Sequence, residues 1–184
     1  MLLEAPGFFE LQVNGFAGID YNDPGVGPDE VGRALDLLRS TGVTRCLPTL
    51  ITSSLDDFAR SARAVLASGH PAVAGLHMEG PYISPEDGPR GAHPRDHVRL
   101  PSLDDFARRQ EAADGRIRLV TLAPELPGSL RLIELIAGQG LRVAIGHCAA
   151  SKAQIAEAVS AGATLSTHLG NGCATSLPRH PNLL

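Results

Sequence analysis

The sequence predicts an α/β fold in which parallel strands alternate with helices, as in part of a (β/α)8 TIM-type barrel. Three observations predict it. Apolar, β-branched segments alternate with amphipathic segments along the whole chain. Glycines follow most of the amphipathic segments, where helices commonly end. Residues that bind metals stand at the ends of three apolar segments, and the strand ends form the rim that carries the active site in such barrels.

Six segments have strand character and five have helical spacing. The expected strands are residues 8–13, 44–50, 72–77, 117–122, 141–145 and 164–167. The expected helices are residues 28–40, 54–68, 103–113, 130–138 and 152–161. Ser54 stands three residues before Asp57 and predicts a capped helix start. Helices should stop at Gly42, Gly69, Gly140 and Gly162.

A closed barrel needs eight strands and typically about 250 residues, which is more than this chain of 184 residues offers. We therefore expect residues 1–184 to form a single, incomplete β/α-barrel domain of about six βα units, without the last two strands. A long irregular connection, residues 80–102, joins the third and fourth strands. Loops of this length inside a compact domain are usually functional.

The composition excludes several functional classes. The net charge of −4 predicts no broad attraction to nucleic acid or to an anionic membrane. The sequence has no apolar run long enough to span a bilayer, and its start lacks the features of a signal peptide. Its three cysteines are too few and too scattered for a disulfide framework, so a reducing cytoplasm is the expected location.

Glu79, His147 and His168 each end an apolar segment just before glycine-rich or polar residues. One carboxylate and two imidazoles from three strand ends can hold one divalent metal ion and leave a position open for water. Zinc is the expected ion, and iron, cobalt or manganese would also fit this ligand set. The arrangement predicts a metal-dependent hydrolase. The alternative is a carboxylate that caps a turn, with two histidines that serve only the packing of the rim.

Seven segments in one order carry a family resemblance: LQVNGFAGID, LPTLITS, HMEGPYIS, GAH, TLAPE, AIGH and THLGNG. Together they resemble the N-acetylglucosamine-6-phosphate deacetylase family of the amidohydrolase superfamily. The resemblance runs from Pro6 to Arg179. It implies that the chain covers about the first six strands of the family's barrel, without the last two strands and without the small β-domain that the family builds from both termini.

The resemblance implies a function for the three metal-type residues. Glu79, His147 and His168 match the family's metal ligands. The implied reaction is hydrolysis of the acetamide of N-acetylglucosamine 6-phosphate to glucosamine 6-phosphate and acetate, in amino-sugar catabolism. The implied partner is a small amino-sugar phosphate, and family members commonly pair as homodimers.

The resemblance also implies substrate contacts. Ala92 and His93 match the segment that contacts the sugar, and Asn171, Gly172 and Arg179 match the segment that holds the substrate and its phosphate. The family more often has Asn-Ala at the Asn-Gly pair, and a small residue lets a backbone N–H approach an anion closely. The planar guanidinium of an arginine suits a phosphate. For His93 and Arg179, simple exposure to solvent is the alternative.

Two departures from the family pattern limit the prediction. The superfamily's first strand often carries His-x-His for a second metal, but this chain has Gln12 and Asn14 there, so we expect one metal. The family's general acid–base aspartate belongs to the eighth strand and is expected beyond Leu184. We therefore assign no catalytic residue to this chain and expect the isolated fragment to be inactive.

The sequence is also compatible with two other functions. One is a related amidohydrolase that acts on another N-acetylated sugar phosphate, such as N-acetylgalactosamine 6-phosphate. The other is a non-catalytic, truncated remnant that only binds metal or sugar phosphate. The presence or absence of further strands that carry an aspartate would distinguish the remnant from an enzyme.

Overall fold

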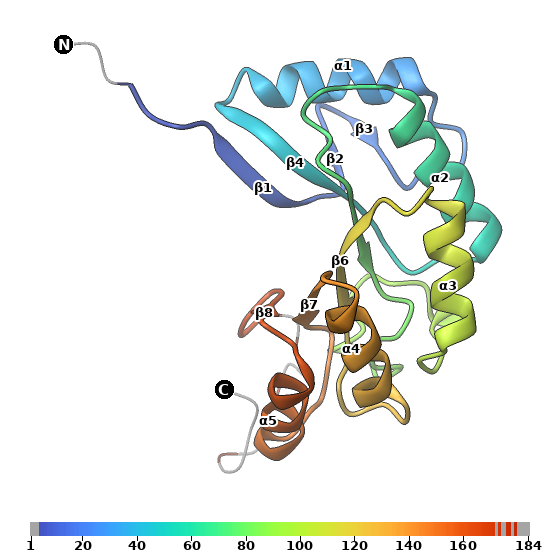
Figure 1. The fold of residues 1–184 in the computed structure, drawn as a ribbon, viewed down its shortest axis with the longest axis vertical. Helices are drawn as coiled ribbons and strands as arrows, with labels where there is room; N and C mark the ends of the chain where they lie inside the picture. Colours follow the sequence, from blue (N-terminus) through green and yellow to red (C-terminus); the bar gives the residue numbers. More distant parts are fainter. Residues whose placement is uncertain (1–3, 172, 174–175, 178, 180–184) are drawn as a thin grey trace.

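The computed structural model describes residues 4–171, 173, 176–177 and 179 (Figure 1). In these residues six parallel strands form one curled, half-barrel sheet, and Figure 1 shows the helices along its outer side. In the order of the sheet, the strands are β1 (Phe8–Val13), β4 (Val43–Leu50), β5 (Leu76–Glu79), β6 (Ile117–Leu122), β7 (Arg142–Ile145) and β8 (Leu165–Ser166). The helices are α1 (Pro28–Arg39), α2 (Leu55–Ala67), α3 (Leu103–Ala112), α4 (Ser129–Gly138) and α5 (Lys152–Ala161). The predicted α/β class with six parallel strands is confirmed.

The third strand was predicted in the wrong place. The predicted range is 72–77, but the strand runs from Leu76 to Glu79, and earlier residues make only one bridge to β4, between Val73 and Cys46. Gly75 explains the shift, because a Cβ atom there would lie 2.4 Å from Arg118 Cγ and 2.8 Å from the Arg116 carbonyl oxygen. The chain presses against the start of β6 at this glycine, and regular pairing with β6 begins only afterwards. The shift makes Glu79 the last residue of the strand.

A small hairpin that was not predicted follows β1. Strands β2 (Gly15–Phe16) and β3 (Ile19–Asp20) pair antiparallel, and Ala17 and Gly18 between them have φ angles of +52° and +83°. Two positive φ angles are typical of the two-residue turns that match the twist of a hairpin. Two-residue strands are too short to show a hydrophobic period, so no pattern in the sequence predicts them.

Helix ends follow the predicted capping residues. The Ser54 hydroxyl oxygen accepts a hydrogen bond from the Asp57 backbone N–H at 3.0 Å, which satisfies a free donor in the first turn of α2. All four predicted stop glycines have positive φ: +97° at Gly42, +59° at Gly69, +76° at Gly140 and +119° at Gly162. Local sequence therefore sets these boundaries.

Ser54→Ala is expected to lower the free energy of unfolding by about 1 kcal/mol, because the Asp57 N–H loses its acceptor. Urea unfolding followed by circular dichroism measures the change. Ser160→Ala, at an exposed serine inside α5, is the matched control and should change stability by less than about 0.5 kcal/mol. Equal effects of the two substitutions would contradict the capping role.

The main hydrophobic core lies between the sheet and the helices, and a smaller cluster of Leu47, Leu119 and Ala144 lies inside the curl. Beside this cluster the concave face holds a cavity of about 650 Å³. β1 and β8 are the two edges of the sheet, and Phe8 and Phe9 on β1 are 70% and 53% exposed. Among the described residues, no helix combines the length and apolar character that a membrane crossing requires.

Candidate metal centre

The structure brings the three predicted ligands together at the carboxyl ends of three strands. Glu79 ends β5, while His147 and His168 each follow the last residue of β7 and β8 by two positions. Their candidate ligand atoms all lie within 4.8 Å of one another. The Glu79 Oε1 atom is 3.3 Å from His147 Nε2 and 3.0 Å from His168 Nε2. The two histidines therefore meet the carboxylate at a single oxygen.

The backbone at both histidines is unusual. His147 and His168 have φ angles of +51° and +53°, a left-handed conformation that residues other than glycine rarely adopt. Such residues cluster at functional sites, where the surrounding structure must hold them. Gly146 permits the tight packing, because a Cβ atom there would lie 2.9 Å from Thr167 Cβ and 3.0 Å from the Thr167 carbonyl oxygen.

The hydrogen bonds of His147 leave one nitrogen free to bind a metal. Its Nδ1 lies 2.9 Å from the Pro89 carbonyl oxygen, which can only accept, so Nδ1 carries the proton. In the neutral ring Nε2 then has a free lone pair and faces Glu79 Oε1. Metal-binding histidines usually have their second nitrogen fixed in this way.

Two of the three donor spacings are close to those around a small tetrahedral metal ion. When each ligand atom lies about 2.0–2.1 Å from a tetrahedral zinc ion, neighbouring ligand atoms are about 3.3 Å apart. The two pairs formed by Glu79 Oε1 are separated by 3.3 Å and 3.0 Å. The third pair, formed by the two histidines, lies within the 4.8 Å that encloses all three donors.

Glu79 is suited to remain ionised in this setting. Its side chain is 3% exposed. Burial pushes the pKa of the carboxyl up, but the neighbouring His147 and His77 side chains and the Gln12 amide outweigh burial and lower this pKa to about 2. A buried, fully ionised carboxylate between two imidazoles is the donor set that a divalent cation needs.

His93 lies beside the triad, and its proton is on Nε2, the nitrogen that faces Glu79. The Thr52 backbone N–H donates to His93 Nδ1 at 3.4 Å, so Nδ1 accepts and Nε2 carries the proton. Burial lowers the pKa of His93 to about 4, with a further contribution from His147, so the ring is neutral at pH 7. Its Nε2 is 3.7 Å from Glu79 Oε2. His93 can therefore donate a hydrogen bond toward the centre.

Gln12 joins the site directly, which the sequence analysis did not predict. Its side-chain N–H group donates to Glu79 Oε1 at 2.8 Å, and its Nε2 lies 3.3 Å from His168 Nε2. From the sequence, Gln12 was only an argument against a second metal. The signal for its contact is its position on β1, one residue before the end of the strand.

Comparisons with known proteins show what this chain is similar to. No protein-family model matches the sequence. N-acetylglucosamine-6-phosphate deacetylase from Bos taurus is 37% identical over 98% of this chain and 45% of its own length. A solved structure of a mutant N-acetyl-D-glucosamine-6-phosphate deacetylase from Mycobacterium smegmatis, in complex with N-acetyl-D-glucosamine-6-phosphate, matches with a TM-score of 0.83 and 34% identity. The match covers 96% of this chain and 46% of that one. Nearly the whole chain therefore matches proteins named N-acetylglucosamine-6-phosphate deacetylase.

The resemblance stated from the motifs is therefore confirmed, and so is its partial extent. The chain spans less than half the length of the deacetylases that it matches. The substrate named for a relative also varies: an N-acetylgalactosamine-6-phosphate deacetylase from Escherichia coli O157:H7 is 30% identical over 99% of this chain and 48% of its own length. The likeness to these deacetylases therefore leaves the identity of the sugar to be proposed.

The structure describes all but one of the other residues that were predicted to contact the substrate. Ala92 is exposed beside the buried His93, and the Asn171 N–H donates to the His168 carbonyl oxygen at 2.7 Å. Both therefore lie close in sequence to a residue of the centre. Arg179 is exposed, and Gly172 lies outside the described residues. A role in substrate binding stays a prediction for all of them.

One further residue near the metal centre had no predicted role. Glu125, in the TLAPE segment, accepts a hydrogen bond from the Ala149 N–H at 2.7 Å, and burial raises the pKa of its carboxyl. Ala149 follows His147 by two residues, so Glu125 holds the turn that carries this histidine. The residue was within a quoted motif, but nothing in the sequence shows which loop it contacts.

Proposed function

We propose that this chain provides the metal-binding part of an enzyme that hydrolyses the acetamide of N-acetylglucosamine 6-phosphate to glucosamine 6-phosphate and acetate. The observation that carries the proposal is the convergence of Glu79, His147 and His168, whose donor atoms lie within 4.8 Å of one another. The names of the relatives support the substrate class. Since those proteins are about twice as long, the activity belongs to this proposal and not to the comparison itself.

The proposed cofactor is one divalent ion held by the triad, with zinc expected and iron, cobalt or manganese as alternatives. When bound, such an ion polarises an acyl carbonyl and lowers the pKa of a water molecule to about 7. Gln12 supports a single ion, because its amide N–H group donates to Glu79 Oε1 and a neutral amide is a poor ligand for zinc. His147 presents its unprotonated Nε2 because its Nδ1 proton is engaged by Pro89.

The chain's own residues suggest how a sugar phosphate would bind. His93 Nε2–H would donate to an oxygen of the substrate, since its Nδ1 is engaged by Thr52. Ala92 would contact the sugar, while Asn171, Gly172 and Arg179 would hold the substrate and its phosphate. The general acid–base aspartate that the resemblance implies is assigned to no residue of this chain.

The wider architecture is also part of the proposal. We place residues 1–184 as one incomplete domain of a closed (β/α)8 barrel, with two further strands between the edges β1 and β8. A homodimer is the proposed assembly, and the cytoplasm is the proposed location. The exposed Phe8 and Phe9 on β1 support further strands that cover this edge.

A specific observation keeps a second substrate in view. The relative from Escherichia coli O157:H7 is named for N-acetylgalactosamine 6-phosphate and covers 99% of this chain. The two sugars differ only in the configuration of one hydroxyl, so the same metal centre could serve either. A remnant that binds metal or sugar phosphate without turnover is the alternative from a different class.

Metal content and ligand binding test the proposal together. Protein purified without chelator is expected to contain about one equivalent of a transition metal by elemental mass spectrometry. Calorimetry is expected to show tighter binding of N-acetylglucosamine 6-phosphate than of its galactosamine epimer. Preference for the epimer would favour the second substrate. A folded chain that binds neither metal nor sugar phosphate would overturn the proposal, and deacetylation by the isolated chain would contradict the predicted lack of turnover.

A further inference from the structure

The two edge strands that carry site residues have few regular pairing bonds near the metal centre. At the carboxyl end of β1, Val13 lies opposite Pro48, which has no N–H to donate to β1. The Val13 N–H itself donates to a side chain, at Thr49 Oγ1, over 3.1 Å. At the other edge β8 is only two residues long. Side-chain hydrogen bonds therefore add to backbone bonds, such as that from the Thr167 N–H to the Ile145 carbonyl oxygen, in holding Gln12 and His168 in place.

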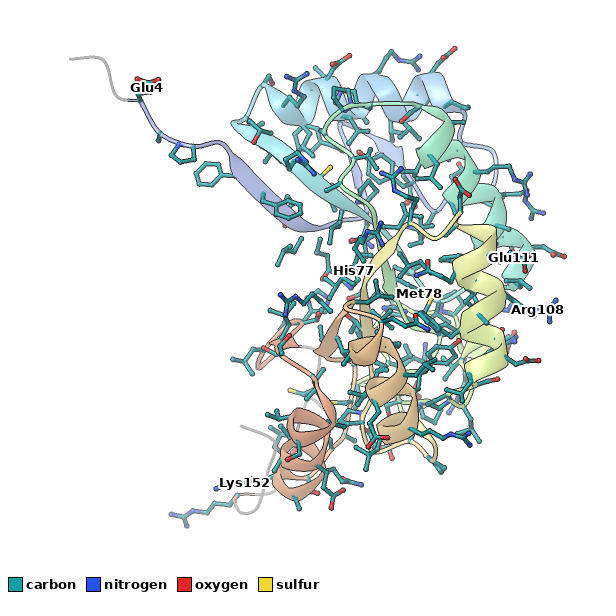
Figure 2. All side chains as sticks on the ribbon, in the orientation of Figure 1. Glu4, His77, Met78, Arg108, Glu111 and Lys152 are labelled. Atoms are coloured by element: carbon teal, nitrogen blue, oxygen red, sulfur yellow. The ribbon has the colours of Figure 1, made fainter. Side chains whose placement is uncertain are left out.

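His77 lies between these two edge strands, farther from the carboxyl end of the sheet than the metal centre. It is on β5, two residues before Glu79, so both side chains point to the same face of the strand. Its neighbour Met78 belongs to the core beneath the helices, and Figure 2 labels both residues near the middle of the molecule. The imidazole of His77 is 1% exposed.

The His77 Nδ1 atom lies 3.3 Å from the Thr49 hydroxyl, and the Leu11 carbonyl oxygen sets the direction of the hydrogen bonds of His77. Its Nδ1 lies 3.1 Å from the Leu11 carbonyl oxygen, which can only accept, so Nδ1 carries the proton. Its Nε2 therefore accepts from Thr121 Oγ1 at 2.8 Å. Since the Thr121 proton is used, Thr121 Oγ1 accepts from the Thr167 hydroxyl at 3.0 Å. The hydrogen bonds form one continuous series from Thr167, directly after β8, through β6 and β5 to β1.

The residues at the two ends of this series of hydrogen bonds are sequence neighbours of site residues. Leu11 precedes Gln12, whose amide contacts both Glu79 and His168. Thr167 precedes His168, and its N–H also donates to the Ile145 carbonyl oxygen at 2.8 Å. A neutral imidazole offers one donor and one acceptor on opposite sides of a rigid ring, which is what a link between two strands on either side requires.

We propose that His77 is a positioning residue that fixes the distance between β1 and β8 and thereby the spacing of the donors around the metal ion. The inference rests on the proposed metal-binding function. His77 itself makes no bond to the triad, so its effect passes through Leu11 on one side and through Thr121 and Thr167 on the other. Loss of a link should weaken metal binding without removing a ligand.

Zinc affinity and the visible spectrum of the cobalt-substituted protein test this role. Changes in the outer shell of metal sites typically cost 10–100-fold in affinity. We expect Thr121→Val and His77→Phe to weaken zinc binding by about 10-fold in competition with a chelator. The cobalt bands should also shift, since they report coordination geometry. Thr121→Ser keeps the hydroxyl and should restore both values.

Ser129→Ala is the matched control. It also removes one buried hydroxyl, which donates to the Ala123 carbonyl oxygen at 2.7 Å at the start of α4. It should lower stability without changing zinc affinity or the cobalt spectrum. If His77→Phe does not fold, the pair of Thr121 variants still decides the question.

The outcomes separate the two claims. Folded Thr121→Val with the zinc affinity and cobalt spectrum of the wild type would overturn the positioning role and leave the metal site standing. Equal losses in Thr121→Val and Thr121→Ser would also overturn it, because the hydroxyl would then be irrelevant. A wild-type protein that binds no metal would overturn both the proposed function and this inference.

Discussion

Glu79→Gln is expected to abolish specific metal binding. The carboxylate is the only anionic member of the triad, and its Oε1 lies within 3.3 Å of both histidine Nε2 atoms. The amide that replaces it is neutral and a poor ligand. Since outer-shell changes alone cost 10–100-fold, loss of this ligand should weaken zinc binding by more than about 100-fold. Elemental mass spectrometry and chelator competition measure the loss.

Glu111→Gln is the matched control, because it makes the same chemical change on an exposed residue that Figure 2 shows on the outer side of α3. This variant should keep one equivalent of metal. Circular dichroism must show that Glu79→Gln is folded. A folded Glu79→Gln protein that retains the wild-type metal content would show that the ion binds elsewhere, and the triad would lose its assignment.

The strand and helix pattern could be predicted because each segment carries its own signal. The ranges 8–13 and 117–122 coincide with β1 and β6, and the stop glycines mark helix ends. The misplaced third strand has a different cause. Its start depends on how closely Gly75 approaches Arg116 and Arg118, which are some forty residues later in the chain. Contacts of this kind leave no local trace in the sequence.

The triad could be predicted because parallel strands end at one edge, so three strand-end ligands must converge. The residues that hold the triad in place could not be predicted. Gln12 was considered only as a missing ligand, and His77 looked like an ordinary strand residue. Their roles follow from the curl of the sheet, which brings β1 and β8 to opposite sides of β5. The spacing His77-x-Glu79 does place both side chains on one face, and this is the only local sign of the network.

The metal-free protein is expected to lose stability as the pH falls from about 6.5 to about 4. Burial lowers the pKa of both His77 and His93 to about 4, while an unfolded histidine has a pKa of about 6.5. Between these values the unfolded state binds more protons, so the free energy of unfolding decreases as the pH falls. Each histidine contributes at most about 3 kcal/mol to this decrease.

Urea unfolding in the presence of chelator, from pH 4 to pH 8, measures the effect, and the stability should be nearly constant above pH 7. The other shifted groups act differently. Glu79, with a pKa of about 2, affects stability only below about pH 4.5, and Glu125, whose pKa is raised by burial, opposes the histidines. His93→Gln removes one of the two titrating rings and should roughly halve the slope between pH 4 and pH 6.5. A slope as steep as in the wild type would show that His93 is not buried in its neutral form, and its role as a donor to the substrate would then have to be abandoned.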